Sequence, residues 1–378
     1  MERLKDGRIN RVALMVSQLM TYGGTERVTV LLSHELSSFY DCSIITRYQN
    51  GSSVYPIDKN VCWLNCNNQK KRLRYCLWHT VKKIISYLKI EKIRVLIVVG
   101  RNNSWIPLAV KLCYPSIKLI YCEHNSLVMN DFQKSWRSRL ENIAYQYLIN
   151  RLSTKIVLLT KKEIPLYLHR NPSVKDKLLY IYNIVDDKLL KRSIKYNLKS
   201  KKILSVGRLD YQKGYESLIK IGARVFKKHS DWQWDIYGDG DPLYVQKLKK
   251  MVKSYSLDKN INFKGISNHL YDEYPNYAIY VMTSRWEGLP MVLLEAQANG
   301  LPIVSYDLYS GPSDIVTEAV NGYLIEPGDI DDFSAKICDL IENPILRENM
   351  SNHTKDDINK FSKDQVIKQW RHLIDSLL

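Results

Sequence analysis

Short apolar runs alternate with helix-like stretches along this chain, and this alternation restricts its fold more than any other feature of the sequence. A strand, helix, strand rhythm of this kind predicts a doubly wound parallel sheet. In the first half, the predicted strands cover residues 11–17, 42–47, 95–99, 118–122, 155–159 and 178–181, and the predicted helices cover 24–38, 70–90, 103–113, 134–150 and 161–169.

The second half of the chain begins the same pattern again. A chain of 378 residues is long for one core and sufficient for two domains. The polar, basic stretch 187–202 is where we expect the boundary between them. The residues Thr-Lys-Lys-Glu at 160–163 predict a capping box at the start of a helix. The strands predicted in the second half cover residues 203–206, 232–237, 261–264, 278–282, 303–306 and 323–325.

The net charge of the chain, +17, is concentrated in its first half. Residues 1–180 carry 29 basic residues (Lys and Arg) against 12 acidic residues (Asp and Glu), whereas the rest of the chain carries 27 basic and 27 acidic residues. A domain with this excess of positive charge attracts anionic partners. The seven Cys are scattered without Cys-x-x-Cys spacing, which indicates reduced thiols in a cytosolic protein. No run approaches the ~20 apolar residues of a membrane span, so any membrane contact is expected to be peripheral.

The most informative motif lies at residues 283–300, which read Thr-Ser-Arg-Trp-Glu-Gly-Leu-Pro-Met-Val-Leu-Leu-Glu-Ala-Gln-Ala-Asn-Gly. It follows the apolar run 278–282, so a strand leads through a loop into a short helix. Pro290 suits the first turn of that helix, and Gly300 suits its C-terminal end.

Two carboxylates bracket the start of this helix. Its amino end, near Gly288 and Leu289, offers unpaired N–H groups that suit an anion. Glu287 precedes it and Glu295 lies inside the helix. Because carboxylates repel phosphate, we expect them to accept hydrogen bonds from neutral hydroxyls, one from a sugar and one from a ribose. The alternative is that Glu287 is a loop charge and Glu295 a solvated helix residue.

The spacing of these glutamates within Arg-Trp-Glu-Gly-Leu-Pro-Met-Val-Leu-Leu-Glu-Ala resembles the signature of the group 1 glycosyltransferases. These are retaining, nucleotide-sugar-dependent enzymes of the GT-B fold, an α/β fold in which two Rossmann-like doubly wound domains face each other across a cleft. The resemblance is dense over residues 203–328 and patchy in the first half. It is closest to members that assemble bacterial surface polysaccharides, such as O-antigen and capsule.

This resemblance implies a division of the chain into three parts. Residues 1–185 would form an N-terminal acceptor-binding domain and residues 186–362 a C-terminal domain that binds the nucleotide sugar. The final helix, within 363–378, would cross back to the N-terminal domain. The sequence Tyr-Asn-Ile-Val-Asp at 182–186 resembles the interdomain turn of the family.

The run Gly-Arg-Leu-Asp-Tyr-Gln-Lys-Gly at 207–214 also resembles a family element, Gly-Arg…Lys-Gly. From the residues alone, Arg208 offers bidentate donors and Lys213 a point charge, and both can converge on one diphosphate. Ordinary surface basicity is the alternative. The resemblance implies that the two side chains bind the donor and stabilise its departing diphosphate.

After the first strand, the residues Tyr-Gly-Gly-Thr-Glu-Arg at 22–27 open a helix. Gly23 and Gly24 would let the backbone approach a phosphate or a sugar, and a simple tight turn is the alternative. The run lacks the Gly-x-Gly-x-x-Gly spacing of a dinucleotide site, and the second strand ends near Arg47 without an acid for a ribose. Both points argue against a dehydrogenase. The resemblance assigns the two glycines to donor binding.

The fourth strand ends in Tyr-Cys-Glu-His-Asn-Ser at residues 121–126. Ligands of open parallel sheets bind beyond the carboxyl ends of the strands, so His124 has a suitable position for a functional histidine. A structural histidine is equally compatible with this pattern. The resemblance implies a place near the donor sugar and the acceptor. We therefore assign His124 and Glu287 to the catalytic site, without making His124 the base.

Residues 70–85 combine dense basic charge with Trp, Tyr, Leu and Ile at helical spacing. Such a helix can lie on anionic lipid headgroups, or it can pack its apolar side on the sheet, and both hold if its basic side faces the lipid. A second basic aromatic stretch, 132–139, would extend the same face. We expect a cytoplasmic protein that is peripherally attached to the inner face of the cell membrane. Its acceptor would be a glycan linked to a polyprenyl diphosphate.

Asp239 and Asp241 form an Asp-x-Asp, which is the metal-binding element of a different glycosyltransferase fold. Here they lie between a strand and a helix, where Asp serves as a turn or N-cap residue, so we interpret them structurally. Neither a metal site nor a cofactor is expected. The expected substrate is a nucleoside-diphosphate sugar, with a UDP-hexose or UDP-N-acetylhexosamine favoured.

Two alternatives to this enzyme stay open at the level of sequence. A non-enzymatic protein of the same fold could hold nucleic acid on its basic half, although the donor-side positions are intact and the basic residues fit an amphipathic helix. A soluble transferase could instead form a disaccharide or a storage glucan without a membrane. The favoured function is a retaining glycosyltransferase that binds no nucleic acid.

Overall fold

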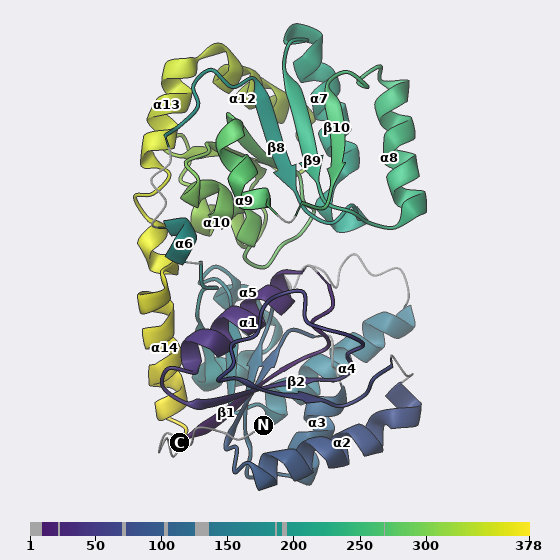
Figure 1. Ribbon diagram of the computed structural model, residues 1–378, viewed down its shortest axis with the longest axis vertical. Helices are drawn as coiled ribbons and strands as arrows, with labels where there is room; N and C mark the ends of the chain where they lie inside the picture. The colour runs from purple at the N-terminus through teal and green to yellow at the C-terminus, as the bar shows by residue number, and fades with distance from the viewer. Residues whose placement is uncertain are drawn as a thin grey trace. The chain divides into compact units, whose positions relative to one another are not determined.

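The computed structural model describes residues 10–21, 23–69, 73–101, 105–124, 136–185, 187–190, 195–267 and 269–378. The chain forms two compact units (Figure 1). Unit 1 contains Met1–Ile184 together with Lys363–Leu378, and unit 2 contains Val185–Ser362.

The sheet of unit 1 is parallel throughout, in the order β3-β2-β1-β4-β5-β6-β7. Its central strand β1 pairs with β2 on one side and β4 on the other, so that Leu14 lies beside Ile44 and Ile97. These strands are near-continuous apolar runs because helices cover both faces of the sheet. Among the described residues the strands are β1 (Arg11–Val16), β2 (Asp41–Thr46), β3 (Cys62–Asn65), β4 (Val95–Val99), β5 (Lys118–Cys122), β6 (Lys155–Leu158) and β7 (Leu178–Tyr180).

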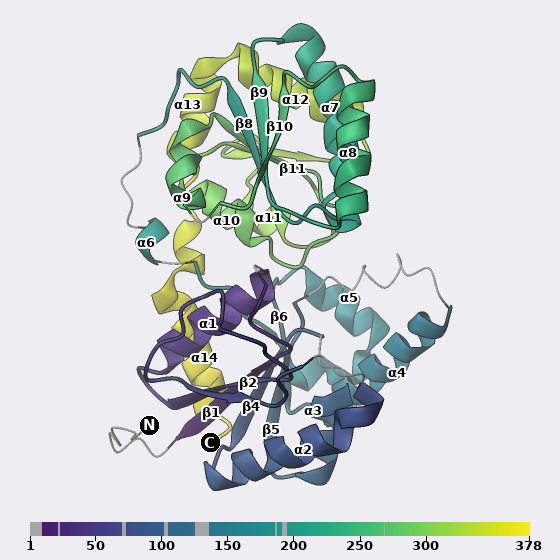
Figure 2. The same ribbon diagram turned by 45° about the vertical axis from the view of Figure 1, so that its right-hand side comes forward.

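The helices of unit 1 divide between the two faces of this sheet. Helix α1 and the last helix of the chain cover one face, and the others cover the opposite face (Figure 2). On the second face Val81, Ile84 and Leu88 of α2 are buried against the sheet. The helices are α1 (Gly24–Leu36), α2 (Leu73–Ile90), α3 (Trp105–Cys113), α4 (Trp136–Leu152), α5 (Glu163–Arg170) and α14 (Lys363–Asp375).

Helix α14 brings the end of the chain back to its beginning. Its apolar side chains, including Trp370, join the core formed by β1, β2 and α1. The Tyr40 hydroxyl donates to Asp375 Oδ1 at 2.6 Å, and Lys363 Nζ lies 2.6 Å from Glu35 Oε2. These contacts place the last helix inside unit 1.

Unit 2 contains a second parallel sheet, in the order β10-β9-β8-β11-β12-β13. Helices pack on it through large aromatic side chains, with Phe226 of α7 6.4 Å from Trp234 of β9 and Phe333 of α12 4.9 Å from Tyr306 of β12, ring centre to ring centre. The described strands are β8 (Lys202–Val206), β9 (Gln233–Tyr237), β10 (Ile261–Gly265), β11 (Ile279–Met282), β12 (Ile303–Tyr306) and β13 (Gly322–Ile325).

The helices of unit 2 follow these strands. They are α6 (Asp187–Leu190), α7 (Tyr215–Lys228), α8 (Pro242–Ser254), α9 (Leu270–Glu273), α10 (Met291–Ala298), α11 (Pro312–Ile315), α12 (Ile330–Glu342) and α13 (Pro344–His353). In the described part of the chain, no helix combines the length and the apolar character needed to cross a membrane.

The predicted alternation of strands and helices is confirmed, with two differences. The edge strand β3 was not predicted. The capping box at 160–163 is wrong, because α5 begins at Glu163 with Lys162 in the N-cap position and the Thr160 hydroxyl is buried without a hydrogen-bond partner. Residues 70–72, 103–104 and 134–135, which were predicted to be helical, lie outside the described residues, as do residues 132–135 of the second basic aromatic stretch.

Candidate functional site

Several of the predicted site residues lie in loops that follow strands at the point where the strand order of each sheet reverses. In unit 2 the chain moves from β8 to β9 on one side and returns to β11 on the other, and in unit 1 β1 is flanked in the same way by β2 and β4. Open parallel sheets bind ligands beyond the carboxyl ends of such strands, because the following loops diverge there. Arg208 and Lys213 follow β8, Glu287 follows β11, and Gly23 and Gly24 follow β1.

Two of the predicted residues are in direct contact in unit 2. Lys213 Nζ lies 2.6 Å from Glu287 Oε1, and the exposed fractions of the two side chains are 16% and 9%. A charge pair removed from water to this degree holds its geometry, because each charge left alone would be costly to bury. The cation predicted to bind phosphate thus neutralises the carboxylate predicted to bind the sugar.

The loops that carry this pair are fixed to each other by main-chain contacts. Gly214 has φ +66°, and a Cβ added there would lie only 2.1 Å from the carbonyl oxygen of Thr283. The Thr283 hydroxyl in turn donates to the carbonyl of Lys213 at 3.2 Å. Gln212 Nε2 donates to the carbonyl of Trp286 at 3.0 Å. Only glycine at 214 permits so close an approach, so the Gly-Arg…Lys-Gly loop and the Glu287 loop form one rigid wall.

The two arginines near this wall differ in what they contact. Arg285 is held by Glu216, with Nη2 to Oε2 at 3.1 Å, and its guanidinium lies 3.9 Å above the ring of Tyr211. Arg208 is 63% exposed and contacts Asp210 at 3.2 Å and Gln212 Oε1 at 3.4 Å. Arg208 is therefore the arginine of this wall that can turn toward a ligand with little loss.

Gly288 and Leu289 lie in the loop directly before α10, whose N-cap residue is Pro290. This loop is packed against the one that follows β12, since a Cβ added at Gly311 would lie 2.4 Å from the carbonyl oxygen of Gly288. The Ser310 hydroxyl donates to the carbonyl of Glu287 at 2.9 Å. The amino end of α10 therefore lies immediately after Glu287, as the sequence predicted.

Glu295 lies inside α10 and is 4% exposed. Its carboxylate accepts a hydrogen bond from the Tyr274 hydroxyl at 3.0 Å and from Tyr271 at 3.4 Å. Burial and the neighbouring carboxylate raise the pKa of Tyr274 well above its usual range, so this hydroxyl stays a donor. The ring of Tyr274 stacks 6.2 Å from Tyr280 of β11. The sequence did not identify the two tyrosines, because the segment at 270–277 carries no motif.

In unit 1, Gly23 is the N-cap residue of α1 and Gly24 begins the helix. A Cβ at Gly23 would overlap Glu26 Oε2 at 2.2 Å, whereas one at Gly24 would meet nothing within 4 Å. The Glu26 carboxylate also accepts a hydrogen bond from Thr21 at 3.0 Å. The Glu26 carboxylate thus lies beside Gly23, while the space next to Gly24 is open.

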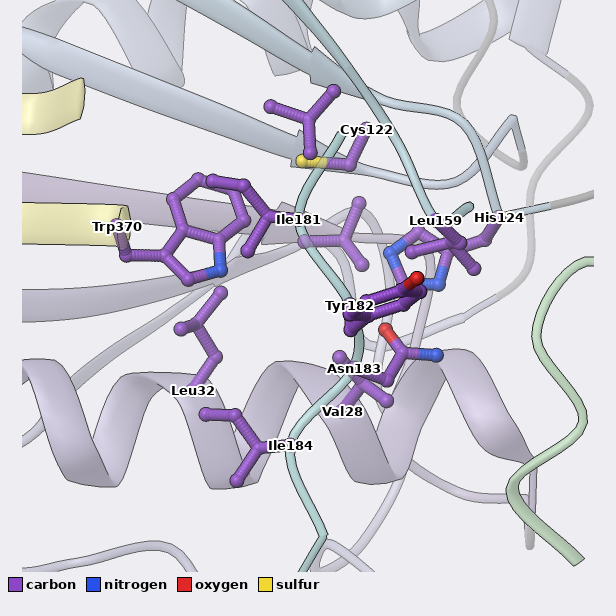
Figure 3. A pocket seen from close by; sticks show the side chains of 12 residues that line it. Val28, Leu32, Cys122, His124, Leu159, Ile181, Tyr182, Asn183, Ile184 and Trp370 are labelled. Atoms are coloured by element: carbon purple, nitrogen blue, oxygen red, sulfur yellow. The ribbon is translucent and has the colours of Figure 1, made fainter. Parts of the chain in front are cut away.

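His124 follows β5 and lines a cavity of about 10 Å³ in unit 1, near the lower limit for one water molecule. Figure 3 shows His124 at one end of this cavity and Trp370 of α14 at the other, with Tyr182 and Asn183 next to the imidazole. Gly100 follows β4 and lies between Thr25 and His124. A Cβ added to it would lie 3.3 Å from Thr25 Cγ2 and 3.8 Å from His124 Cβ. The first turn of α1 and the loops after β4 and β5 therefore meet near His124.

Burial lowers the pKa of His124 from its ordinary value to about 4. The imidazole is therefore neutral near pH 7, with one nitrogen that donates and one that accepts. Asn183, only 5% exposed, lines the same cavity, although the sequence indicated it only as part of the interdomain turn. The neighbouring Glu123 faces the other side of the sheet, where it accepts from the Tyr121 hydroxyl at 3.1 Å. Asn125 and Ser126 of the predicted motif lie outside the described residues.

The structural interpretation of Asp239 and Asp241 is confirmed. Asp241 is the N-cap residue of α8 and accepts from the backbone N–H of Leu243 at 3.0 Å and Tyr244 at 3.1 Å. Asp239 accepts from the N–H of Gly240 at 2.8 Å. Both carboxylates are used by the turn that starts the helix, as expected for such a position.

One group of metal-ligating side chains occurs within the part of the chain that the structure describes. Its members, His229, Cys338 and Glu342, offer ligand atoms within 4.8 Å of one another. They lie at the end of α7 and on α12, and none of them is a predicted site residue. The absence of a metal in catalysis stays a prediction.

Comparisons with known proteins agree with this architecture. An uncharacterized glycosyltransferase of Haemophilus influenzae is 28% identical over 97% of this chain and 100% of its own length. The amylovoran biosynthesis glycosyltransferase AmsD of Erwinia amylovora is 26% identical, with 97% and 99% covered. The crystal structure of Anabaena Alr3699/HepE in complex with UDP and glucose superposes with a TM-score of 0.80 at 17% identity, covering 97% of this chain and 99% of the other.

Two parallel-sheet α/β domains with this topology make up the GT-B fold. The similarity to the two relatives over nearly their whole length makes the class of protein a glycosyltransferase. The family model of glycosyl transferases group 1 matches residues 186–357. Residues 186–357 therefore belong to the group 1 glycosyltransferases, and the chain is similar over 97% of its length to the two glycosyltransferases named above. This assignment confirms the resemblance on which the sequence-based predictions rested.

Proposed function

We propose that this chain transfers a hexose or N-acetylhexosamine from a nucleoside-diphosphate sugar, with UDP favoured, to a glycan acceptor, with retention of the anomeric configuration. The observation on which this proposal rests is the ion pair between Lys213 and Glu287. The pair lies where the strand order of the unit 2 sheet reverses, just before the amino end of α10. A cation, a carboxylate and a helix end at one place suit the phosphate and the sugar of such a donor. The crystallised HepE neighbour holds UDP and glucose, which supports UDP as the nucleotide.

Donor binding would replace the contact between Lys213 and Glu287 with contacts from each of them to the donor. The diphosphate takes Lys213 and Arg208, and the amides near Gly288 and Leu289 add hydrogen bonds. Glu287, released from Lys213, then accepts hydrogen bonds from the donor-sugar hydroxyls. Each charge keeps a partner throughout, so binding avoids leaving a buried charge unpaired.

Glu295 would hold the ribose. Its carboxylate accepts from Tyr274 and Tyr271, and because each carboxylate oxygen can accept more than one hydrogen bond, ribose hydroxyls can share these acceptors. The two tyrosines fix the direction of the carboxylate before the donor arrives, and this reduces the entropy lost on binding.

The reaction forms a bond between the acceptor oxygen and the anomeric carbon and breaks the bond from that carbon to the diphosphate oxygen. The proton of the attacking hydroxyl passes to the departing phosphate on the same face of the sugar. Arg208 and Lys213 stabilise the charge that develops on the diphosphate. His124, neutral near pH 7, lies in the acceptor domain and hydrogen-bonds a hydroxyl of the reacting sugars. Gly23 and Gly24 let the backbone of the first loop approach the donor.

The acceptor would be a glycan on a polyprenyl diphosphate, in the synthesis of a bacterial surface polysaccharide such as lipopolysaccharide. The relative AmsD takes part in amylovoran biosynthesis, which supports a polysaccharide product. The basic excess of residues 1–180 suits both the acceptor diphosphate and an anionic membrane surface. The enzyme would therefore work at the inner face of the cell membrane.

The proposal is tested by incubating the chain with a panel of nucleotide sugars and a bacterial lipid extract, with Glu287→Ala and Arg208→Ala as controls. We expect transfer from one donor and its loss in both variants, and proton spectra of the product should show the anomeric configuration of the donor. Inversion of that configuration would remove the retaining mechanism. Silence with every donor, together with no nucleotide binding, would remove the proposed function.

A further inference from the structure

Helix α4 carries apolar side chains on two opposite faces. On its inner face Tyr145 and Ile149 are buried against the sheet. Its outer face exposes four large apolar side chains, which we call the outer stripe. Spacings of four, three and four residues align them along one side of the helix. The members and their exposed fractions are Trp136 (68%), Leu140 (56%), Ile143 (59%) and Tyr147 (61%).

Within the described part of unit 1, the outer stripe takes no part in the two apolar cores. Single exposed apolar residues are normal on any protein surface, but a contiguous row marks an interaction site. Helix α2 buries Val81, Ile84 and Leu88 and exposes Lys82, Lys83 and Lys89. Two apolar residues of α2, Trp78 (63%) and Ile90 (75%), are also exposed, but they lie twelve residues apart and form no row. Among the described side chains of α2 the exposed apolar residues are thus isolated, whereas α4 presents a contiguous apolar row.

Basic side chains flank the outer stripe on both sides. At 100° per residue, Arg139 lies on one side and Arg137 and Arg151 on the other. The guanidinium of Arg137 lies 5.5 Å from the ring of Trp136, and Arg151 Nη1 contacts the Tyr147 hydroxyl at 3.4 Å.

The acid of this helix points away from the stripe. Glu141 accepts a hydrogen bond from Trp105 Nε1 of α3 at 3.1 Å, which turns its carboxylate toward the body of the unit. The surface around the stripe is therefore apolar in the middle and positive at its borders.

We propose that the outer stripe of α4 docks unit 1 on an anionic lipid membrane. The apolar side chains enter the boundary between headgroups and acyl chains, and the arginines contact lipid phosphates. Trp136 and Tyr147, near the two ends of the stripe, are the residue types that prefer this boundary. The inference rests on the membrane partner proposed above and names the element that binds it.

The same borders argue against a second copy of this chain as the occupant. A two-fold symmetric dimer through the stripe would bring the same patch of each copy together. Arg137, Arg139 and Arg151 of one copy would then face those of the other, and like charges at an interface disfavour association. Lipid phosphates neutralise these arginines instead.

The test measures binding of the full chain to vesicles by co-sedimentation, without nucleotide sugar. Vesicles of phosphatidylglycerol mixed with phosphatidylcholine are compared with phosphatidylcholine alone. The stripe variant is Leu140→Gln with Ile143→Gln, and the matched control is Leu243→Gln with Ile345→Gln, two residues of unit 2 that are 77% and 70% exposed. All four positions are at the surface, so both variants should keep the thermal unfolding midpoint of the wild type.

We expect the wild type and the matched control to bind the anionic vesicles equally, and the stripe variant to bind at least about tenfold more weakly. Lipids brominated on the acyl chain should quench the wild type more than a Trp136→Phe variant. Hydrolysis of nucleotide sugar should be unchanged in the stripe variant, which separates this inference from the proposed function.

Three results would overturn the proposal. One is equal vesicle binding by the stripe variant and the wild type, which would leave the membrane partner in place and remove α4 as its site. Another is the absence of wild-type binding to any vesicle. The third is a dimer in solution that the stripe variant converts to a monomer, which would assign the stripe to a second copy.

Discussion

At the scale of single residues, the proposed donor site depends mainly on the contact between Lys213 and Glu287. Both side chains were chosen from the sequence for separate roles, the cation for phosphate and the carboxylate for sugar. No pattern in the sequence indicated that they pair with each other, because 74 positions separate them. Their contact depends on β8 and β11 lying side by side, which only the sheet order establishes.

Removing one member of this pair should destabilise unit 2. Lys213→Met leaves the carboxylate of Glu287 buried without its cation, and we expect a loss of about 3 kcal/mol in the free energy of unfolding. The double change Lys213→Met with Glu287→Gln should recover part of that loss, because it leaves no unpaired charge. Urea denaturation of the wild type, both single variants and the double variant gives the coupling energy. Additive losses would show that the two side chains do not interact.

His124 should make the stability of the chain depend on pH in mild acid. Its pKa is about 4 in the folded chain, against an ordinary value of about 6.5 for the unfolded chain. The unfolded state therefore takes up the proton first, so stability is complete above pH 6.5 and falls as the pH drops toward 4. The side chain of His124 is half-buried, so solvent reduces the expected loss to on the order of 1–2 kcal/mol.

The measurement is the thermal unfolding midpoint between pH 7.5 and 4, for the wild type and for His124→Gln. The glutamine variant should lose the part of the slope that lies between pH 6.5 and 4. An identical slope in both proteins would mean that His124 is not protected from protonation. Other groups that titrate in this range affect both proteins equally and cancel in the comparison.

At the scale of elements, the sequence predicted strands better than the details at their ends. Apolar runs such as 95–99 and 118–122 match β4 and β5 at both ends, because buried parallel strands must be apolar on both faces. The edge strand β3 was not predicted, because its sequence Cys-Trp-Leu-Asn is short and only half-buried. The capping box failed because the α5 helix starts at Glu163, so that Thr160 lies before the N-cap position.

Residues of the proposed donor site that belong to a motif could be predicted from the sequence. Residues that reach the site only through packing could not. Arg208, Lys213, Glu287 and Glu295 were predicted from motifs that resemble those of the family, and their role in donor binding stays a prediction. Tyr274 was not predicted, because its role depends on a stack with Tyr280 and a contact with α10 that come from distant parts of the chain.

Replacing this tyrosine should weaken donor binding without changing the chemistry. Tyr274→Phe removes the 3.0 Å hydrogen bond that orients Glu295 and keeps the aromatic stack. A lost hydrogen bond to a charged group is worth about 1.5 kcal/mol, so we expect KM for the nucleotide sugar to rise about tenfold at unchanged kcat. Tyr271→Phe, whose contact is 3.4 Å, should have a smaller effect. A fall in kcat with constant KM would place the effect in the transfer step.

The rigid wall formed by the two donor loops depends on Gly214. Alanine there requires φ +66° and brings a Cβ within 2.1 Å of a backbone oxygen. We expect Gly214→Ala to cost more than about 2 kcal/mol in the free energy of unfolding. Gly328→Ala is the matched control, because φ is +96° but nothing lies within 4 Å. Its cost should be limited to backbone strain, and equal costs at both positions would contradict the close approach.

At the scale of the whole chain, the end of the sequence completes the core of unit 1. Trp370 is 5% exposed, packs in the core formed with α1 and β1, and borders the cavity that contains His124. The early strands of the chain therefore reach their final packing only after the last residues are present.

Damage to α14 should therefore appear in unit 1. Trp370→Ala should lower the free energy of unfolding of unit 1 by about 3–4 kcal/mol through the cavity it creates. Limited proteolysis with mass mapping should show earlier cleavage within residues 10–184 and unchanged protection of unit 2. Cleavage that increases only in unit 2 would contradict the assignment of α14 to unit 1.

The division of charge between the two halves of the chain agrees with the division of tasks that we propose. The neutral second half carries the donor site, where each cation already has an acid beside it, and the basic first half carries the surface proposed to meet lipid phosphates. Composition predicted this asymmetry. It did not predict that the apolar contact would come from α4, because residues on both faces of that helix are apolar and only burial separates them.

The claim that unit 2 holds a nucleoside-diphosphate donor is tested most directly by titration calorimetry with UDP. The wild type should bind, Arg208→Ala should bind at least about tenfold more weakly, and Arg224→Ala should match the wild type, because Arg224 pairs with Asp331 away from the site. Equal affinity in all three proteins, or no binding of UDP or any other nucleoside diphosphate to the wild type, would contradict the account.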